Sequence, residues 1–150
     1  MGDAPSIRPV TEADRADWEP LWQGYLTFYE AQLTDAVTDA TWRRFLDSAE
    51  PLHGLVAESN GRLVGLAHYL LHRSTWAPQC YCYLEDLFVT PSRRGGGVGR
   101  RLIGAVEQAA RNAQATRLYW STHQTNVDAQ QLYNKLAERS GFIQYRKRLD

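Results

Sequence analysis

Apolar and polar residues alternate along this chain with two different periods, which separate expected helices from expected strands. Between Asp14 and Glu30 the apolar residues recur every three or four positions, which predicts a helix with one buried face. Residues 53–58, 62–71 and 80–89 are short apolar runs bounded by turn residues, which predicts strands. The dipeptide Asn60-Gly61 between the first two runs indicates a tight antiparallel hairpin.

The other expected elements follow from the same patterns and from capping residues. The expected strands run from Ser6 to Val10, from Arg117 to Thr122 and from Phe142 to about Lys147. One expected helix begins at Asp39 or Thr41 and ends before Pro51, and another covers residues 98–113. A third helix begins at the capping residue Asn126, and its apolar face extends as far as Leu136. The order β-α-α-β-β-β-α-β-α-β predicts an α/β protein with a mixed, mostly antiparallel sheet flanked by helices.

Length and composition suit one domain over residues 1–150, because 150 residues with 43% hydrophobic content are enough for a proper core. No run of about 18 apolar residues and no charged-then-apolar leader occurs, so we expect a cytoplasmic protein without membrane association. Cys80 and Cys82 lie two positions apart on one expected strand. No second Cys/His pair has suitable spacing, so no metal is expected.

The net charge is zero, but its distribution along the chain is uneven. Residues 1–92 carry 6 Lys/Arg and 13 Asp/Glu, whereas residues 93–150 carry 11 and 4. A neutral total argues against nucleic-acid binding, which depends on neutralising phosphates. The division suits a second half that binds an anion and a first half that faces a cationic substrate, or else it is solvated surface charge without function.

A glycine-rich loop joins the strand over residues 80–89 to the helix that follows, and it begins at Arg93 and Arg94. Glycines allow a ligand to approach the backbone, and a helix start adds free N–H groups, so the segment predicts an anion cradle for phosphate or pyrophosphate. A Walker loop is excluded because no lysine follows the glycines. The dinucleotide fingerprint G-x-G-x-x-G is excluded because Val98, Arg100 or Leu102 stands where glycine is needed.

The loop fits a different pattern, R-G-x-G-x-G from Arg94 to Gly99, preceded by V-x-P at residues 89–91. Downstream, residues 126–133 read N-x-x-A-x-x-L-Y, and Gly141-Phe142 follows. Together these motifs resemble the GNAT N-acetyltransferase superfamily over about residues 53–146. The segment from Tyr83 to Val89 is most similar to the diamine (spermidine/spermine-type) acetyltransferases. The end of the chain is more similar to the histone/polyamine-type subgroup.

The resemblance implies a GNAT fold and acetyl-CoA as cosubstrate. The pantetheine arm would bind along the backbone before the glycine loop, the pyrophosphate would bind the loop amides, and Tyr133 would protonate the leaving thiolate. The alternative for Tyr133 is plain core packing. The residues expected to bind acetyl-CoA are Leu87, Val89, Arg94, Gly95, Gly96, Gly97, Val98, Gly99, Arg100, Asn126, Ala129 and Tyr133.

Glu85 is the candidate base that takes the amine proton, with Asp86 in reserve. On a strand Glu85 shares a face with Leu87 and Val89, while Asp86 points to the other side. The alternative is a charge at the sheet edge bonded to a neighbour. Tyr29 and Trp76 are candidates for the substrate wall, because aromatic rings and a carboxylate suit a cation.

Further candidates for the substrate wall are three aromatic or acidic residues of the first helix, Trp22, Tyr25 and Glu30. The alternative for the two aromatic residues is core packing. We expect a small-molecule primary amine, polyamine-like or amino-acid-like, as acceptor, and a homodimer. The alternatives are a protein-lysine acetyltransferase and a non-catalytic acetyl-CoA-binding regulatory domain.

Overall fold

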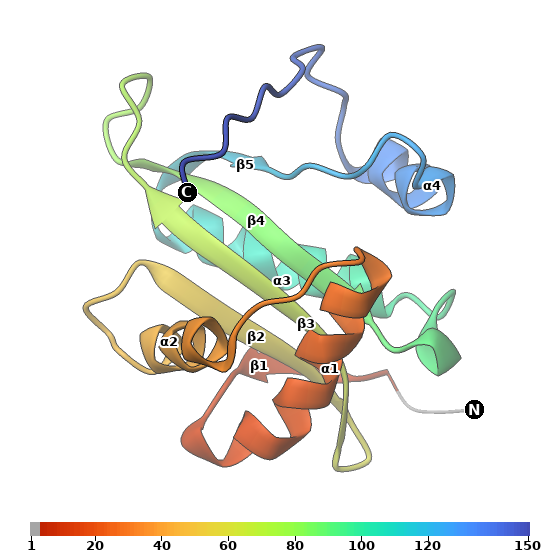
Figure 1. Cartoon of the computed structure of the whole chain (residues 1–150). Helices are drawn as coiled ribbons and strands as arrows, with labels where there is room; N and C mark the ends of the chain where they lie inside the picture. Colours follow the sequence, from red (N-terminus) through yellow and green to blue (C-terminus); the bar gives the residue numbers. More distant parts are fainter. Residues whose placement is uncertain (1–3) are drawn as a thin grey trace. The chain divides into compact units, whose positions relative to one another are not determined.

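The computed structural model describes residues 4–150, which form two compact units, one through Trp120 and one from Ser121 to Asp150. The first unit contains a five-stranded sheet in the spatial order β1-β2-β3-β4-β5 (Figure 1). Its strands are β1 (Ser6–Pro9), β2 (Leu52–Ser59), β3 (Arg62–His72), β4 (Cys80–Val89) and β5 (Ala115–Tyr119). Neighbours are antiparallel except β4 and β5, which are parallel. The predicted mixed, mostly antiparallel sheet is confirmed.

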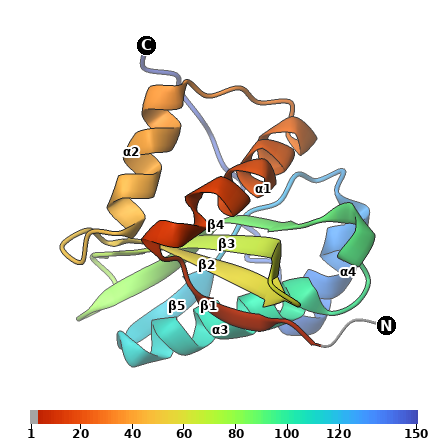
Figure 2. The same cartoon turned by 90° about the horizontal axis from the view of Figure 1, so that it is seen from below.

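Helices cover both faces of this sheet. In the first unit they are α1 (Arg15–Phe28), α2 (Asp35–Phe45) and α3 (Val98–Asn112), with short 3-10 turns η1 (Glu12–Asp14) and η2 (Pro91–Arg93). Figure 2 shows α1 and α2 on one face and α3 on the opposite face. The second unit contains α4 (Val127–Leu136). Every helix within residues 4–150 is too short or too polar to cross a lipid bilayer.

Two glycines let helices lie close to the sheet. A Cβ atom on Gly24 of α1 would come within 2.9 Å of the Phe88 ring on β4. A Cβ atom on Gly65 of β3 would come within 3.1 Å of Leu102 on α3. The core on the α1 side centres on Trp18 and Leu66, whose side chains are fully buried. Burying a large apolar side chain stabilises a fold by roughly 1.5–3 kcal/mol.

The start of α1 is fixed by an acidic residue. The Asp14 carboxylate accepts from the Thr11 backbone N–H at 2.7 Å and from the Arg8 guanidinium at 2.7 and 2.9 Å. Arg8 also donates to Glu58 on β2 at 3.2 Å. The hydrogen bonds from Arg8 and Thr11 hold the pKa of Asp14 down to about 2. The cap therefore ties the first helix to β1 and β2.

The hairpin turn between β2 and β3 is confirmed, since Asn60 and Gly61 both have positive φ, 52° and 76°. The start predicted for the second helix is wrong, because α2 begins at Asp35. Thr34 caps it by accepting from the Val37 N–H at 3.3 Å, so the helix starts one turn earlier than Asp39. The order of elements is confirmed through α4.

The last predicted strand, Phe142 to Lys147, is not a strand in the structure. The side chains of Phe142, Ile143 and Tyr145 are exposed by 85%, 77% and 89%. Alternating apolar residues form a strand only when a neighbouring backbone pairs with them. Within the described residues, this segment has no such pairing partner.

Candidate active site

Strand β4 is paired on one side only over its second half. Strand β3 follows it as far as Val89. Strand β5 pairs with it from Cys80 to Tyr83 and ends at Tyr119. Beyond Tyr83, the edge of β4 that faces β5 has no strand partner in the described part of the chain. Such an edge offers free backbone groups to an extended ligand.

The hydrogen-bond pattern identifies the free groups on this edge. The Thr90 N–H donates to the Val64 carbonyl at 2.9 Å, so these two residues form a bonded pair. Bonded and non-bonded pairs alternate along an antiparallel ladder. Val89, opposite Gly65, and Leu87 are therefore in non-bonded pairs, and their N–H and C=O groups point away from β3. Leu87 and Val89, the two residues predicted to bind the pantetheine arm, therefore present backbone groups at the open edge, where the Val89 carbonyl accepts from Arg94 Nε at 3.0 Å.

Glu85 is the additional residue of a β-bulge in β4. The register shifts between His68 and Tyr69, which pair with Asp86 and Leu84, so Glu85 has no partner on β3. A bulge re-aims a side chain locally and is frequent beside active sites. Glu85 is exposed while Asp86 is buried, as the predicted division of faces requires. Partial burial and the neighbouring Asp86 charge raise the pKa of Glu85 above its ordinary value.

The glycine loop has the open backbone conformation that the predicted anion cradle requires. Gly95 and Gly97 have φ of 81° and 86°, a conformation that favours glycine. Cβ atoms built on them would meet nothing within 4 Å, so the space beside the loop is open. Among residues 4–150, the amides of residues 95–100 have no hydrogen-bond acceptor. The free amides and the positive end of α3 together suit a phosphate.

The two arginines among the residues expected to bind acetyl-CoA differ in their surroundings. Arg94 donates from Nε to the Val89 carbonyl at 3.0 Å. Its guanidinium also lies 5.4 Å from the Phe88 ring centroid and 5.6 Å from that of Phe28. Arg100, on the first turn of α3, is exposed. Arg100 is therefore freer than Arg94 to bind an anion.

A buried hydrogen-bond chain lies beside Glu85, on the side of the sheet covered by α1. Trp18 donates from Nε1 to His68 Nε2 at 3.1 Å, and His68 Nδ1 lies 2.9 Å from Asp86 Oδ2. The Tyr25 hydroxyl is also hydrogen-bonded to Asp86. Burial, the Asp86 charge and this hydrogen bond raise the pKa of Tyr25. The sequence prediction missed this chain, although His68 and Asp86, polar residues in apolar strands, were a signal for it.

The aromatic wall predicted around the acceptor is only partly available. Trp22 is buried in the core and donates to Thr38 Oγ1 at 3.2 Å, so its prediction as a wall residue is wrong. Tyr25 is half-buried and Tyr29 is exposed, and their ring centroids lie 4.9 Å apart. Trp76, in the β3–β4 loop, is 75% exposed. Tyr29 and Trp76 stay predictions as substrate contacts.

The remaining predicted site residues lie in the second unit, on or before α4. Asn126 is the N-cap residue, but its side chain makes no capping bond and instead donates to Thr122 Oγ1 at 3.2 Å. Ala129 and Tyr133 are half-buried on α4. Their roles toward acetyl-CoA stay predictions.

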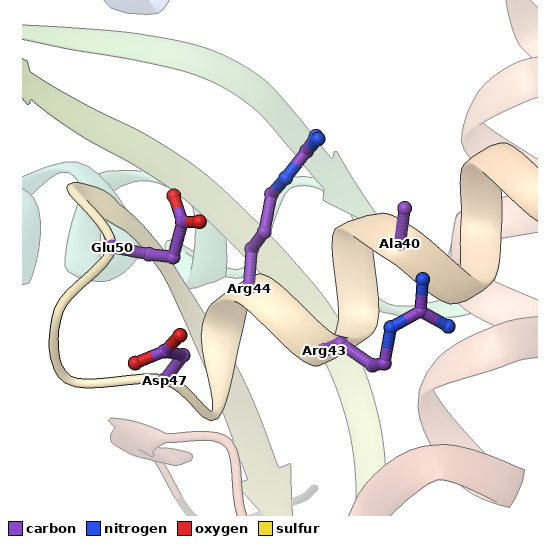
Figure 3. Close-up of a pocket in the computed structure, with 5 residues that line it drawn as sticks. All are labelled: Ala40, Arg43, Arg44, Asp47 and Glu50. Carbon is purple, nitrogen blue, oxygen red and sulfur yellow. The ribbon is translucent and has the colours of Figure 1, made fainter.

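A pocket on the first unit lies apart from these residues in the sequence. It has a volume of about 300 Å³ and is open to solvent. Figure 3 shows its lining on α2 and the loop after it, formed by Ala40, Arg43, Arg44, Asp47 and Glu50. It contains none of the predicted site residues. Within residues 4–150, no group of three or more His, Cys, Asp or Glu side chains could hold a metal ion.

The first unit is thus an α/β sheet in which a glycine-rich loop follows a strand with one open edge. The chain belongs to the acetyltransferase (GNAT) family, whose family model matches residues 14–137. It is therefore an N-acetyltransferase, which is an acyltransferase that acts on amines.

Its similarity to individual proteins extends over most of the chain. It is 32% identical over 149 residues to D-amino-acid N-acetyltransferase HPA3 of Saccharomyces cerevisiae, covering 98% of this chain and 92% of that protein. It is 34% identical over 95 residues to thialysine N-epsilon-acetyltransferase of Mus musculus, covering 59% and 55%. A solved structure of aminoglycoside N-acetyltransferase AAC(6')-Iy in complex with CoA has a TM-score of 0.82 and 25% identity, covering 99% and 98%.

Proposed function

We propose that this protein transfers the acetyl group of acetyl-CoA to a primary amine of a small molecule, of the amino-acid or polyamine type. The observation that carries the proposal is the open edge of β4 beside a glycine loop with free amides. The edge suits an amide-containing arm, and the loop suits a pyrophosphate. A similar solved structure is a complex of an aminoglycoside N-acetyltransferase with CoA.

Bound acetyl-CoA supplies a thioester carbonyl that an amine attacks directly, forming the C–N bond as the C–S bond breaks. Leu87 and Val89 hold the arm through their backbone groups. The amides of residues 95–100 and the Arg100 side chain hold the phosphates. Backbone groups hold the arm and so align the reacting carbonyl. The amine can then attack it directly, without a covalent enzyme intermediate.

Proton transfer falls to two side chains. An alkyl ammonium has a pKa of about 10.4, so the acceptor must lose a proton before it attacks. Glu85 takes this proton, directly or through water, and the upward shift of its pKa makes its carboxylate a stronger base. Tyr133 returns a proton to the departing thiolate sulfur. The acidic first part of the chain fits a cationic acceptor.

The similar enzymes suggest which acceptors to test. Their names refer to D-amino acids, thialysine and aminoglycosides, and each of these has an amine nitrogen. The test is a panel of D- and L-amino acids, diamines, thialysine, one aminoglycoside and a lysine-containing peptide, each with acetyl-CoA, following release of free thiol. We expect turnover with a small amine and little with the peptide. Turnover with the peptide alone would replace the small-molecule assignment, and release with no acceptor would contradict amine transfer.

A further inference from the structure

A group of aromatic side chains lies where β3 ends, β4 begins and β5 runs beside β4. Tyr81 is opposite His72 of β3, and residues directly opposite each other point to the same face of a sheet. Tyr83 is opposite Tyr119 of β5, and their rings stack with centroids 4.9 Å apart. The Tyr119 hydroxyl is hydrogen-bonded to His72 Nε2 at 2.7 Å. We call these four residues the aromatic platform, and their contacts show that they share one face of the sheet.

The aromatic platform is on the face of the sheet that α1 and α2 cover. His68 and His72 are four positions apart on β3, so they point to the same face, and His68 accepts from Trp18 of α1. On this face α1 packs on β3 and β4 and α2 packs on β2, whereas β5 packs against α3 on the opposite face (Figure 2). The side of the platform that β5 forms therefore lies beyond both helices.

Arg117 of β5 lies at the edge of the aromatic platform. Its guanidinium carbon is 4.4 Å from the ring centroid of Tyr81, which is buried, and 5.9 Å from that of Trp76. The loop that carries Trp76 is closed by Arg73, which donates to the Gln79 carbonyl at 2.9 Å. Aromatic rings hold a guanidinium through its flat face and leave its N–H groups at the rim available.

The protein does not balance the charge of Arg117. Its side chain is exposed, and within residues 4–150 its guanidinium forms no hydrogen bond and no ion pair. Residues 59–84 and 108–127, which include β3, the start of β4 and all of β5, contain no Asp or Glu. A guanidinium with free donors on a surface without carboxylates suits a carboxylate ligand, which it can bind through two parallel hydrogen bonds.

Arg117 is also far from the glycine loop. Strand β5 pairs with the start of β4, where Cys80 is opposite Ala115 and Cys82 is opposite Leu118. The glycine loop follows the other end of β4, after Val89. The backbone from Cys82 to Val89 spans roughly 20 Å at the usual rise of a strand. The anion that suits Arg117 is therefore a different group from the pyrophosphate that suits the loop.

We propose that Arg117 determines the specificity for the acceptor: it binds the carboxylate of an amino acid whose reacting amine is at the far end of the side chain. The inference rests on the proposed function, which places the arm of acetyl-CoA at the open edge of β4. That edge begins beyond the pair of Tyr83 and Tyr119, where β5 ends. Arg117 and Tyr119 are two positions apart, which corresponds to about 7 Å along a strand.

This spacing sets the length of the acceptor. A carboxylate at Arg117 and an amine at the open edge must be several bonds apart, as they are for the side-chain amine of lysine. The α-amine of an amino acid is next to the carboxylate and would stop short of the edge. The aliphatic part of the acceptor would lie on the stacked rings of Tyr83 and Tyr119.

Arg117 also separates the two acceptor types of the proposed function. A diamine has the same reacting amine and chain as lysine but no carboxylate. Its second ammonium would come close to the Arg117 guanidinium, and this like-charge contact disfavours it. The inference therefore selects an amino-acid acceptor over a polyamine.

The test compares lysine (each enantiomer) with cadaverine, which differs from it only by the missing carboxylate, in wild type and Arg117→Gln. The matched control is Arg62→Gln, because Arg62 is also an exposed arginine but lies at the start of β3, at the opposite end of that strand from His72. The readout is kcat and KM for both acceptors with acetyl-CoA. The control should keep wild-type values.

Wild type should prefer lysine over cadaverine by about tenfold or more in kcat/KM, as expected for a charge-assisted pair of hydrogen bonds. Arg117→Gln should lose this preference through a higher KM for lysine, with cadaverine changed by less than about threefold. An equal loss for both acceptors, or no loss for lysine, would overturn the proposal.

Two further results bear on the charge and on the length. Arg117→Lys keeps the positive charge without the planar donors, so it should recover part of the preference for lysine. Arg117→Lys values no better than those of Arg117→Gln would contradict the proposal. Mass spectrometry of the product should place the acetyl group on the side-chain nitrogen of lysine, and acetylation of the α-amine would contradict the proposed spacing.

Equilibrium dialysis with radiolabelled lysine gives a result that does not depend on turnover. Wild type should bind lysine about tenfold or more tightly than Arg117→Gln does. Binding that depends on Arg117 in a protein that acetylates no amine would refute the proposed function and leave the carboxylate site in place. Acetylation of cadaverine in preference to lysine by wild type would support the proposed function and refute the role of Arg117.

Discussion

Arg94 Nε donates to the carbonyl oxygen of Val89, 3.0 Å away, so the arginine that opens the glycine loop holds the end of the strand before it. The same guanidinium lies over the rings of Phe28 and Phe88. Through these contacts Arg94 stabilises the conformation of the loop. They leave Arg100 as the better candidate for a direct phosphate contact.

Arg100→Ala and Arg94→Ala should therefore have different effects. Loss of a charge-assisted bond costs about 1.5–3 kcal/mol, so Arg100→Ala should weaken acetyl-CoA binding by about tenfold or more, with little change in melting temperature. Arg94→Ala should lower the free energy of unfolding by about 1 kcal/mol through the lost hydrogen bond and ring contacts. Calorimetric titration and thermal unfolding measure both. The opposite pattern would assign the phosphate contact to Arg94.

Gly97→Val should abolish acetyl-CoA binding. A β-branched residue is strained at a φ of 86°, and its side chain would occupy the open space beside the free amides. Gly61→Val is the matched control, because Gly61 also has a positive φ and open surroundings but lies in the β2–β3 turn. Both variants should lose stability, and only Gly97→Val should lose binding by calorimetry. Binding retained in Gly97→Val would mean that the cradle is misplaced.

Tyr133→Phe should lower turnover strongly while acetyl-CoA affinity stays nearly the same. A positioned general acid contributes roughly 10²–10⁴-fold, and phenylalanine removes only the hydroxyl. Tyr145→Phe, which removes an exposed hydroxyl from the same unit, is the control and should keep wild-type turnover. Turnover and melting temperature are measured for each. A fall of less than about threefold in Tyr133→Phe would make Tyr133 structural.

Stability should fall in acid as Asp14 loses its charge. Its pKa is held down to about 2 by Arg8 and Thr11, below the value of about 3.9 in an unfolded chain. This stabilisation is fully present above about pH 4 and is lost as the pH falls through about 2. It amounts to about 2.6 kcal/mol at most, because the pKa falls from about 3.9 to about 2 and one pKa unit corresponds to about 1.4 kcal/mol.

Urea unfolding of Asp14→Asn and wild type between pH 2 and pH 6 tests this. The variant should be less stable at pH 6, and the difference should shrink toward pH 2. A difference that stays constant over this range would show that the Asp14 charge contributes nothing.

We also predict a homodimer in which the C-terminal segment pairs with a second copy. Its apolar residues Phe142, Ile143 and Leu149 are exposed, and an extended segment can add to a sheet edge of another chain. Light scattering should give twice the monomer mass at micromolar concentration, and removal of residues 142–150 should give the monomer. A monomer mass for the full chain would contradict the prediction.

The sequence by itself determined the features that depend on local spacing. The glycine loop, the Asn60-Gly61 turn and the apolar stripe of α3 were predicted because each backbone conformation requires particular residue types at neighbouring positions. The opposite faces of Glu85 and Asp86 also followed from the period of a strand.

Only the tertiary structure decided which side chains meet. Trp18 and His68 are 50 positions apart, and periodicity gives the face of a side chain but not its partner. The bulge at Glu85 depends on the register between β3 and β4, and Trp22 is a core residue because α2 covers it with Thr38. The apolar alternation after Phe142 did not make a strand, because backbone pairing needs a second strand that no local pattern supplies.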